Sequence, residues 1–136
     1  MIILNVDDDA EDREMFLDAI KEISPWITCL TANNGIEAQS LWNTAPNFPD
    51  IDLIFLDINM PQMDGLALLK VIKNDTRFKD VPVYMLSTTS NEAEISKIKS
   101  LGATYIAKQS RFADIVADLS SVIYPGMKLI ELENKR

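Results

Sequence analysis

Five short apolar segments alternate along the chain with longer segments whose apolar residues recur at helical spacing. The apolar segments are residues 2–6, 27–31, 53–56, 81–86 and 105–107. Helical spacing is found over residues 11–23, 38–45, 65–72, 91–101 and 112–123, with proline, glycine or asparagine turn signals between several of these segments. Because strands that alternate with helices are joined by crossovers, this pattern predicts a parallel sheet with helices on both faces.

The order of the strands follows from the handedness of such crossovers. Right-handed connections leave few topologies for five strands, and the common one is the flavodoxin-like order 2-1-3-4-5, with five helices. We expect one α/β domain over residues 1–124, whose last helix ends at Pro125-Gly126. Residues 125–136 would form a short tail, in which Leu129, Ile130 and Leu132 are apolar enough to dock on the domain or on a second copy.

The composition excludes several kinds of chemistry. The chain has no histidine and one cysteine, Cys29, which excludes imidazole catalysis, an internal disulfide and a multi-cysteine metal site. Its 13 basic and 21 acidic residues give a net charge of −8, so we expect neither nucleic acid nor a membrane as a direct partner. We see neither a signal peptide nor a long apolar span, and we expect a cytoplasmic protein.

Polar residues gather where the predicted strands end. The residues that follow the first, third, fourth and fifth strands are Asp7, Asp8, Asp9, Asp57, Ser87, Thr88 and Lys108. The carboxyl ends of parallel strands share one edge of the sheet, where ligands bind in this fold class. Since two carboxylates roughly 4 Å apart repel by about 4 kcal/mol at an effective dielectric of about 20, such a site must take up a proton or a cation. Oxygen ligands alone suit Mg²⁺ (or Mn²⁺), and Lys108 would neutralise part of the remaining charge.

The aspartates also have simpler explanations. Three aspartates before a helix can cap its N-terminus and interact favourably with its dipole. Asp7, Asp9 and Glu11 have the spacing of a calcium-binding loop, but Asp12 stands where that loop requires glycine. An FMN site would need phosphate-binding donors after the first strand, where this chain has carboxylates. Asp57 is the hardest to explain structurally, because a carboxylate directly after four apolar residues is poorly solvated without a partner.

Structural explanations exist outside the acidic residues too. A serine at position 87 can serve in a turn or cap, and a single lysine is usually solvated. Core positions are the ordinary expectation for Trp26, Cys29, Trp42 and Tyr105. A functional site is favoured by the joint placement at one edge of Asp8, Asp57, Ser87 and Lys108.

Four segments resemble the receiver domain of response regulators from bacterial two-component signalling, over nearly the whole chain from Ile2 to about Tyr124. They are Ile-Leu-Asn-Val-Asp-Asp at 3–8, Leu-Ile-Phe-Leu-Asp-Ile-Asn-Met-Pro-Gln-Met-Asp-Gly at 53–65, Val-Tyr-Met-Leu-Ser-Thr at 83–88 and Gly-Ala-Thr-Tyr-Ile-Ala-Lys at 102–108. These motifs are specific in combination. The resemblance implies a stand-alone receiver, with no room in the chain for an output domain.

The resemblance implies a phosphoacceptor site. Asp57 would accept the phosphoryl group. Mg²⁺ would be bound by Asp57, Asp8 and the backbone carbonyl of Asn59, and by Asp7 through a water molecule. Lys108 would bind the phosphoryl oxygens. These roles agree with the needs of phosphoryl transfer, which asks a protein mainly for positioning and for stabilisation of charge on the equatorial oxygens.

The resemblance also implies a switch. Ser87 would bind a phosphoryl oxygen and draw its loop toward the site, and Tyr105 would then turn inward. The side chains of Asn59 and Thr89 would tune the lifetime of the acyl phosphate. The surface that changes would be formed by the helix at 91–101, the strand at 105–107 and the helix at 112–123, and it would bind a downstream protein target.

One position departs from the family pattern. Receiver domains usually have proline after the lysine, often with a cis peptide bond, and this chain has Gln109. A cis bond before a non-proline residue costs about 2.5–4 kcal/mol, so we expect a trans bond here and a different shape for the loop 109–111.

Three functions are compatible with the sequence. The first is a signalling phosphoacceptor that receives its phosphoryl group from a sensor histidine kinase or a phosphotransfer protein, catalyses only its own phosphorylation and dephosphorylation, and could dimerise on activation. The second is an adaptor or phosphate sink of the same fold that binds partners without phosphorylation. The third, a metal-dependent phosphatase acting on small molecules, is the least favoured, because no second general base is visible.

Overall fold

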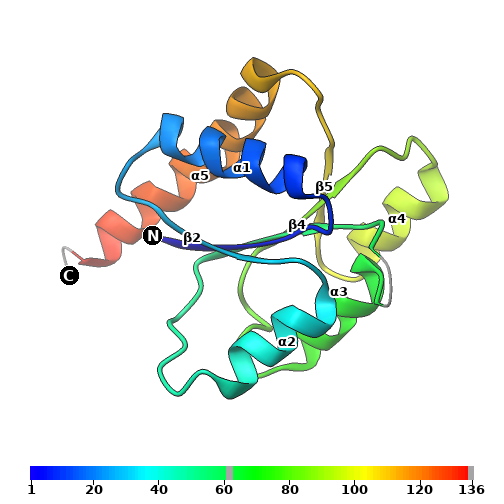
Figure 1. Ribbon diagram of the computed structural model, residues 1–136, viewed down its shortest axis with the longest axis horizontal. Helices are drawn as coiled ribbons and strands as arrows, with labels where there is room; N and C mark the ends of the chain where they lie inside the picture. The colour runs from blue at the N-terminus through cyan, green and yellow to red at the C-terminus, as the bar shows by residue number, and fades with distance from the viewer. Residues whose placement is uncertain (61–62, 135–136) are drawn as a thin grey trace.

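The computed structural model describes residues 1–60 and 63–134, which form a sheet with helices on both faces (Figure 1). The five strands of the described part are all parallel and follow the order β2-β1-β3-β4-β5, which confirms the predicted flavodoxin-like topology. The strands are β1 (Ile2–Val6), β2 (Thr28–Ala32), β3 (Leu53–Asp57), β4 (Val83–Ser87) and β5 (Thr104–Ala107). The helices are α1 (Ala10–Ile23), α2 (Gly35–Thr44), α3 (Gly65–Asn74), α4 (Glu92–Ser100) and α5 (Phe112–Asn134). Residues 61–62 of the motif at 53–65, and residues 135–136 of the predicted tail, lie outside the described residues.

Side-chain caps determine where four of the helices begin. Asp9, Asn34, Asp64 and Asn91 each accept a hydrogen bond from a backbone N–H of the first helical turn. These bonds satisfy donors that a helix N-terminus otherwise leaves unpaired, and the cap before α1 is one of the simpler roles that the sequence allows for its aspartates. At the other end of α4, Gly102 has a φ of 86°, the left-handed conformation in which glycine is favoured at a helix terminus.

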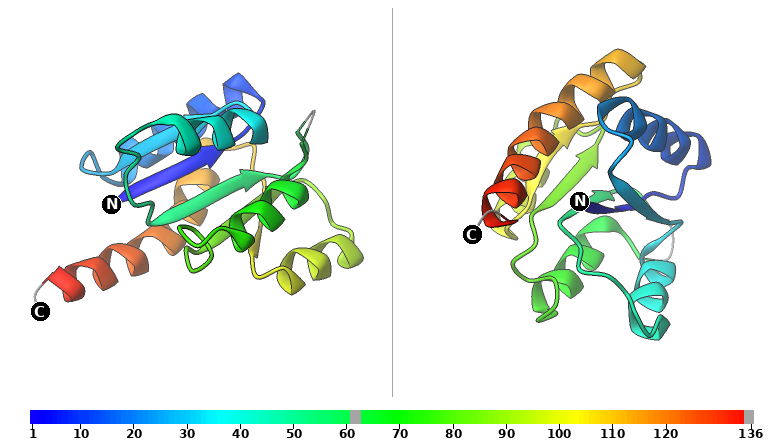
Figure 2. Two further views of the ribbon diagram at one scale, coloured as in Figure 1. Left: turned by 90° about the horizontal axis from the view of Figure 1, so that it is seen from below. Right: turned by 90° about the vertical axis from the view of Figure 1, so that its left-hand side faces the viewer.

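Two apolar layers hold the helices to the sheet. Helices α1 and α5 lie on one face, and α2, α3 and α4 lie on the other (Figures 1 and 2). The core under α1 and α5 contains Ile3, Phe16, Ala19, Ile20, Leu53, Phe55, Leu119 and Ile123. The opposite core is built on Leu4, Val6, Ile54 and Leu56 from the strands. Successive residues of a strand face opposite sides, and helices cover both sides of β3. Its first four residues are therefore apolar, and all five of its residues, Asp57 included, are buried.

The last helix is longer than predicted. The expectation that it ends at Pro125-Gly126 is wrong, because α5 continues through Pro125 to Asn134, and its C-terminal part extends beyond the sheet (Figure 2). A proline inside a helix costs about 3 kcal/mol. Tertiary contacts oppose that cost: the backbone at Gly126 lies against Met1 and Leu53, and Met127 packs on the core under α1 and α5. Leu129 and Leu132 are exposed on this part of the helix.

The two tryptophans differ in environment. Trp42 on α2 is buried and lies 4.9 Å from Phe78 between ring centroids, as a core residue should. The expectation of a core position is wrong for Trp26, which lies between α1 and β2 and is 85% exposed. Cys29 and Tyr105 are half-buried. Among the described residues, the helices include none with the length and apolar character needed to cross a membrane.

Candidate functional site

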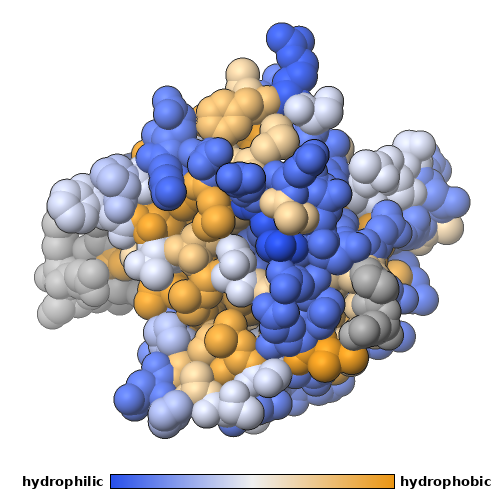
Figure 3. Space-filling model, in the orientation of Figure 1, coloured by the Kyte–Doolittle hydropathy of each residue, from blue (hydrophilic) through white to orange (hydrophobic). Residues whose placement is uncertain are grey.

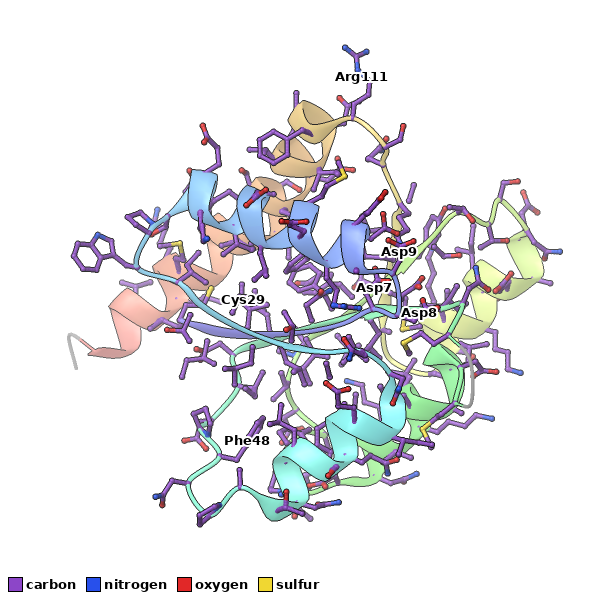
Figure 4. The ribbon with its side chains drawn as sticks, in the orientation of Figure 1. Asp7, Asp8, Asp9, Cys29, Phe48 and Arg111 are labelled. Carbon is purple, nitrogen blue, oxygen red and sulfur yellow. The ribbon has the colours of Figure 1, made fainter. Side chains whose placement is uncertain are left out.

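The register of the sheet gathers the predicted site residues at one edge. Val6 pairs with Leu56, Asp57 with Leu86, and Ser87 with Ala107. The residues that follow these positions therefore leave the sheet side by side, from neighbouring strands. Figure 4 shows Asp7, Asp8 and Asp9 in the turn between β1 and α1. Hydrophilic residues gather around this edge on the molecular surface (Figure 3).

Three carboxylates form the centre of the site. One oxygen from each of Asp7, Asp8 and Asp57 lies within 4.8 Å of the others. Asp7 and Asp57 are only 3% and 5% exposed, whereas Asp8 is exposed to solvent. Asp9 is not part of this cluster. Its side chain caps α1 by accepting from the backbone N–H of Asp12 at 3.0 Å.

Lys108 brings a positive charge into this cluster from the end of β5. Its ammonium nitrogen lies 3.1 Å from Asp7 Oδ2 and 3.5 Å from Asp57 Oδ1. The backbone N–H of Lys108 donates to the carbonyl of Ser87 at 2.9 Å, which fixes the start of the loop beyond β5. No cis peptide bond occurs in the described residues, so the expected trans bond before Gln109 is confirmed. The Gln109 side chain donates to Asp118 on α5 at 3.1 Å.

The ionisation of the site reflects burial first and charge second. The pKa of Asp57 is raised to about 6. Desolvation is the largest cause and the charge of Asp7 adds to it, while the charge of Lys108 acts in the opposite direction. Burial likewise raises the pKa of Asp7 above its ordinary value, against the hydrogen bond from the Asp9 backbone and the charge of Lys108. Burial alone would lower the pKa of Lys108. The hydrogen bond to Asp12 and the charges of Asp7 and Asp57 outweigh it and raise that pKa.

A chain of hydrogen bonds connects β4 to β5 beside the carboxylates. Ser87 is fully buried, and its hydroxyl oxygen accepts from the backbone N–H of Thr89 at 3.1 Å. The carbonyl of Thr89 in turn accepts from the hydroxyl of Tyr105 at 2.7 Å. The expected switch residues therefore share one network. The backbone N–H of Asn59 donates to Asp57 Oδ1 at 3.4 Å, and the Asn59 side chain is exposed.

Sequence reasoning missed two residues of α1. Asp12 Oδ2 lies 2.8 Å from the Lys108 ammonium, and Arg13 donates to the backbone carbonyl of Asp7 at 2.7 Å. One signal could have found them: a helix that starts directly after β1 must place its first turn at the same edge as the strand ends.

Gly65 allows the loop after β3 to return close to Asp57. A side-chain Cβ at this position would lie 2.4 Å from the carbonyl oxygen of Asp57 and 2.8 Å from the Cα of Ile58. Both neighbours are backbone atoms, which cannot move aside as a flexible side chain could. The Gly65 backbone N–H donates to the carbonyl of Ile58 at 3.0 Å, so the close approach is also a hydrogen-bonded one.

The donor set suits a divalent cation. The three clustered carboxylates supply oxygen ligands alone, and their mutual repulsion is relieved by positive charge. Two of them are buried, so water screens that repulsion poorly. Hard cations such as Mg²⁺ and Mn²⁺ prefer this ligand set over nitrogen and sulfur. The residues present therefore fit the predicted metal.

The fold and the site together define an α/β domain with an acidic site at the carboxyl edge of its parallel sheet. Residues 3–120 match the family model of the response regulator receiver domain. The chain is 33% identical over 109 residues to the chemotaxis protein CheY1 of Helicobacter pylori, covering 79% of this chain and 85% of that protein. It is 30% identical over 109 residues to a CheY homologue of Campylobacter jejuni, covering 79% and 81%.

Solved structures agree with these sequence relatives. The phosphorylated cyanobacterial phytochrome response regulator RcpA superimposes with a TM-score of 0.80 at 30% identity, over 89% of each chain. The Mn²⁺-bound form of response regulator Rcp1 superimposes with a TM-score of 0.78 at 26% identity, over 89% of this chain and 90% of that one. This chain belongs to the response regulator receiver domain family of two-component signalling.

Proposed function

We propose that this protein is a phosphorylatable receiver that accepts a phosphoryl group on Asp57. The observation that carries the proposal is the surroundings of that carboxylate. Asp57 is buried at the carboxyl edge of the sheet, has Asp7 and Asp8 within 4.8 Å, and lies 3.5 Å from the ammonium of Lys108. A nucleophilic carboxylate with a cation site on one side and a fixed ammonium on the other matches the requirements of phosphoryl transfer.

The transfer forms one bond and breaks another. A carboxylate oxygen of Asp57 forms a bond to phosphorus while the bond from phosphorus to the donor's leaving atom breaks. The leaving atom is the imidazole nitrogen of a phosphohistidine, which takes up a proton, or the acyl oxygen of a small phosphodonor. The donor in a signalling pathway would be a sensor histidine kinase or a phosphotransfer protein. Hydrolysis of the acyl phosphate would return Asp57 to its starting state, so the chain turns over no separate substrate.

The other residues of the site would bind and orient the phosphoryl group. Mg²⁺ would be held by Asp8, Asp57 and the backbone carbonyl of Asn59, with Asp7 acting through water. When bound, the metal supplies positive charge that neutralises the phosphoryl oxygens. Lys108 would supply a second charge from the opposite side, and the Ser87 hydroxyl would donate to a phosphoryl oxygen.

Movement of the β4–α4 loop would carry the signal outward. The Ser87 hydroxyl now accepts from the backbone of Thr89, and the Thr89 carbonyl accepts from Tyr105. A Ser87 hydroxyl that turns to a phosphoryl oxygen would draw this loop toward Asp57 and disturb the bond to Tyr105. The side chains of Thr89 and Asn59 would then affect access to the acyl phosphate. The face formed by α4, β5 and α5 would change shape and bind a downstream protein, or a second copy of the chain.

The first experiment is the intact mass of the protein after incubation with Mg²⁺ and acetyl phosphate. We expect the wild type to gain one phosphoryl group, and Asp57→Asn to gain none. Asp64→Asn is the matched control, because Asp64 follows the same strand but caps α3, and it should gain the group as the wild type does. Absence of a gain in the wild type, with acetyl phosphate and with a phosphohistidine donor, would contradict the proposal and favour a receiver fold that binds partners without phosphorylation.

A further inference from the structure

The Lys108 ammonium has a nearer partner than either buried carboxylate. Asp12 Oδ2 lies 2.8 Å from its nitrogen, compared with 3.1 Å for Asp7 and 3.5 Å for Asp57. The contact with Asp7 is also a hydrogen bond, and the contacts with Asp12 and Asp57 are ion pairs. The shortest of the three contacts joins Lys108 to α1, and it uses a residue to which the proposed phosphoacceptor chemistry gives no role.

Asp12 is held in place by the start of α1. The Asp9 side chain accepts from the backbone N–H of Asp12 at 3.0 Å, and Arg13 donates to the backbone carbonyl of Asp7 at 2.7 Å. These two bonds fix the first turn of the helix against the end of β1. The Asp12 side chain is 39% exposed and that of Lys108 is 18% exposed, so the pair lies at the rim of the acidic pocket, where the ammonium can still turn inward.

We propose that Asp12 is a positioning residue that holds the ammonium of Lys108 toward α1 in the unphosphorylated protein and competes with the phosphoryl oxygens for it. This inference rests on the function proposed for Asp57. A phosphoryl group arriving at Asp57 needs a donor from Lys108, and the ion pair with Asp12 must lengthen or be shared to provide it. Asp12 thereby lowers the rate at which Asp57 is phosphorylated.

The competition has an expected size. Ion pairs that are partly open to solvent contribute up to about 1 kcal/mol, which corresponds to about fivefold in an equilibrium or rate constant. Replacing the Asp12 carboxylate by a neutral amide ends the competition without changing the shape of the side chain. We therefore expect Asp12→Asn to raise the rate of phosphorylation at limiting acetyl phosphate by up to about fivefold.

The experiment follows phosphorylation by intact mass at limiting acetyl phosphate and saturating Mg²⁺. Asp12→Glu keeps the carboxylate and should remain close to the wild type. Glu11→Gln is the matched control, because it removes one negative charge from the same exposed helix turn, and it should change the rate far less than Asp12→Asn. Thermal unfolding of each variant verifies that the fold is kept.

A Lys108→Ala background separates positioning from general electrostatics. If Asp12 acts through Lys108, then Asp12→Asn should have no larger effect than Glu11→Gln once the ammonium is gone. An equal gain in both backgrounds, or an equal gain for Glu11→Gln and Asp12→Asn, contradicts the inference. A wild type that is phosphorylated but unaffected by Asp12→Asn contradicts this inference alone. A wild type that takes up no phosphoryl group contradicts the proposed function as well.

Discussion

Asp57 should destabilise the metal-free protein at neutral pH, and its replacement by asparagine should reveal by how much. Burial raises the pKa of Asp57 from 3.8 to about 6. The folded protein therefore binds this proton more tightly than the unfolded chain, and stability falls as the pH rises from about 4 through 6. A rise of about two units in the pKa of Asp57 corresponds to a loss of roughly 3 kcal/mol in the free energy of unfolding, and the full loss is present above pH 7. The attraction of Lys108 is already included in that shift.

Urea unfolding in the presence of a chelator measures this contribution. Linkage predicts that the Asp57 carboxylate destabilises the folded protein by about 3 kcal/mol at pH 7.5. At pH 4.5 the destabilisation is about 1 kcal/mol, because the carboxyl of the unfolded chain is itself partly protonated. The free energy of unfolding of Asp57→Asn relative to the wild type should therefore be about 2 kcal/mol higher at pH 7.5 than at pH 4.5. Any constant cost of packing the amide cancels in this comparison. In a thermal scan at pH 7.5, about 3 kcal/mol corresponds to a midpoint about 10 °C higher.

The matched control is Asp80→Asn, which removes the same charge from an exposed loop position. We expect its stability relative to the wild type to be nearly independent of pH over this range. The reasoning is refuted if Asp57→Asn shows no pH-dependent difference, or if its advantage is larger at pH 4.5 than at pH 7.5. Either result would mean that the Asp57 carboxylate is better solvated or better paired in the metal-free protein than its burial indicates.

Two further predictions concern backbone packing and a buried amide. Gly65→Ala would place a Cβ too close to the Asp57 carbonyl oxygen. This substitution should lower the free energy of unfolding by about 1–3 kcal/mol and slow phosphorylation. A variant as stable as the wild type in urea would contradict this prediction. Asn5 on β1 is 1% exposed, and neither the nitrogen nor the oxygen of its amide has a hydrogen-bond partner among the described residues. Asn5→Val should therefore stabilise the protein by about 1–3 kcal/mol in the same assay, and a loss of stability would show that the amide is bonded to buried water.

Local patterns in the sequence were sufficient for the architecture. Apolar runs and helical spacing predicted five strands and five helices, and right-handed crossovers predicted their order. Because the carboxyl ends of parallel strands share one edge, the same reasoning predicts that Asp8, Asp57, Ser87 and Lys108 lie together. The roles of these residues came from the resemblance to the receiver family, since a strand end specifies a position and not a chemistry.

Contacts between segments distant in the sequence decided the partner of Lys108 and the length of α5. The sequence determined that Lys108 lies at the acidic edge, but only the packing of α1 beside the end of β5 made Asp12 its nearest carboxylate. Pro125 locally favours the end of a helix. The contacts of Gly126 and Met127 with the rest of the domain nevertheless keep α5 helical beyond it. Periodicity and capping act over a few residues and can be read from the chain. The choice among nearby partners depends on distances set by the whole fold, which no local pattern contains.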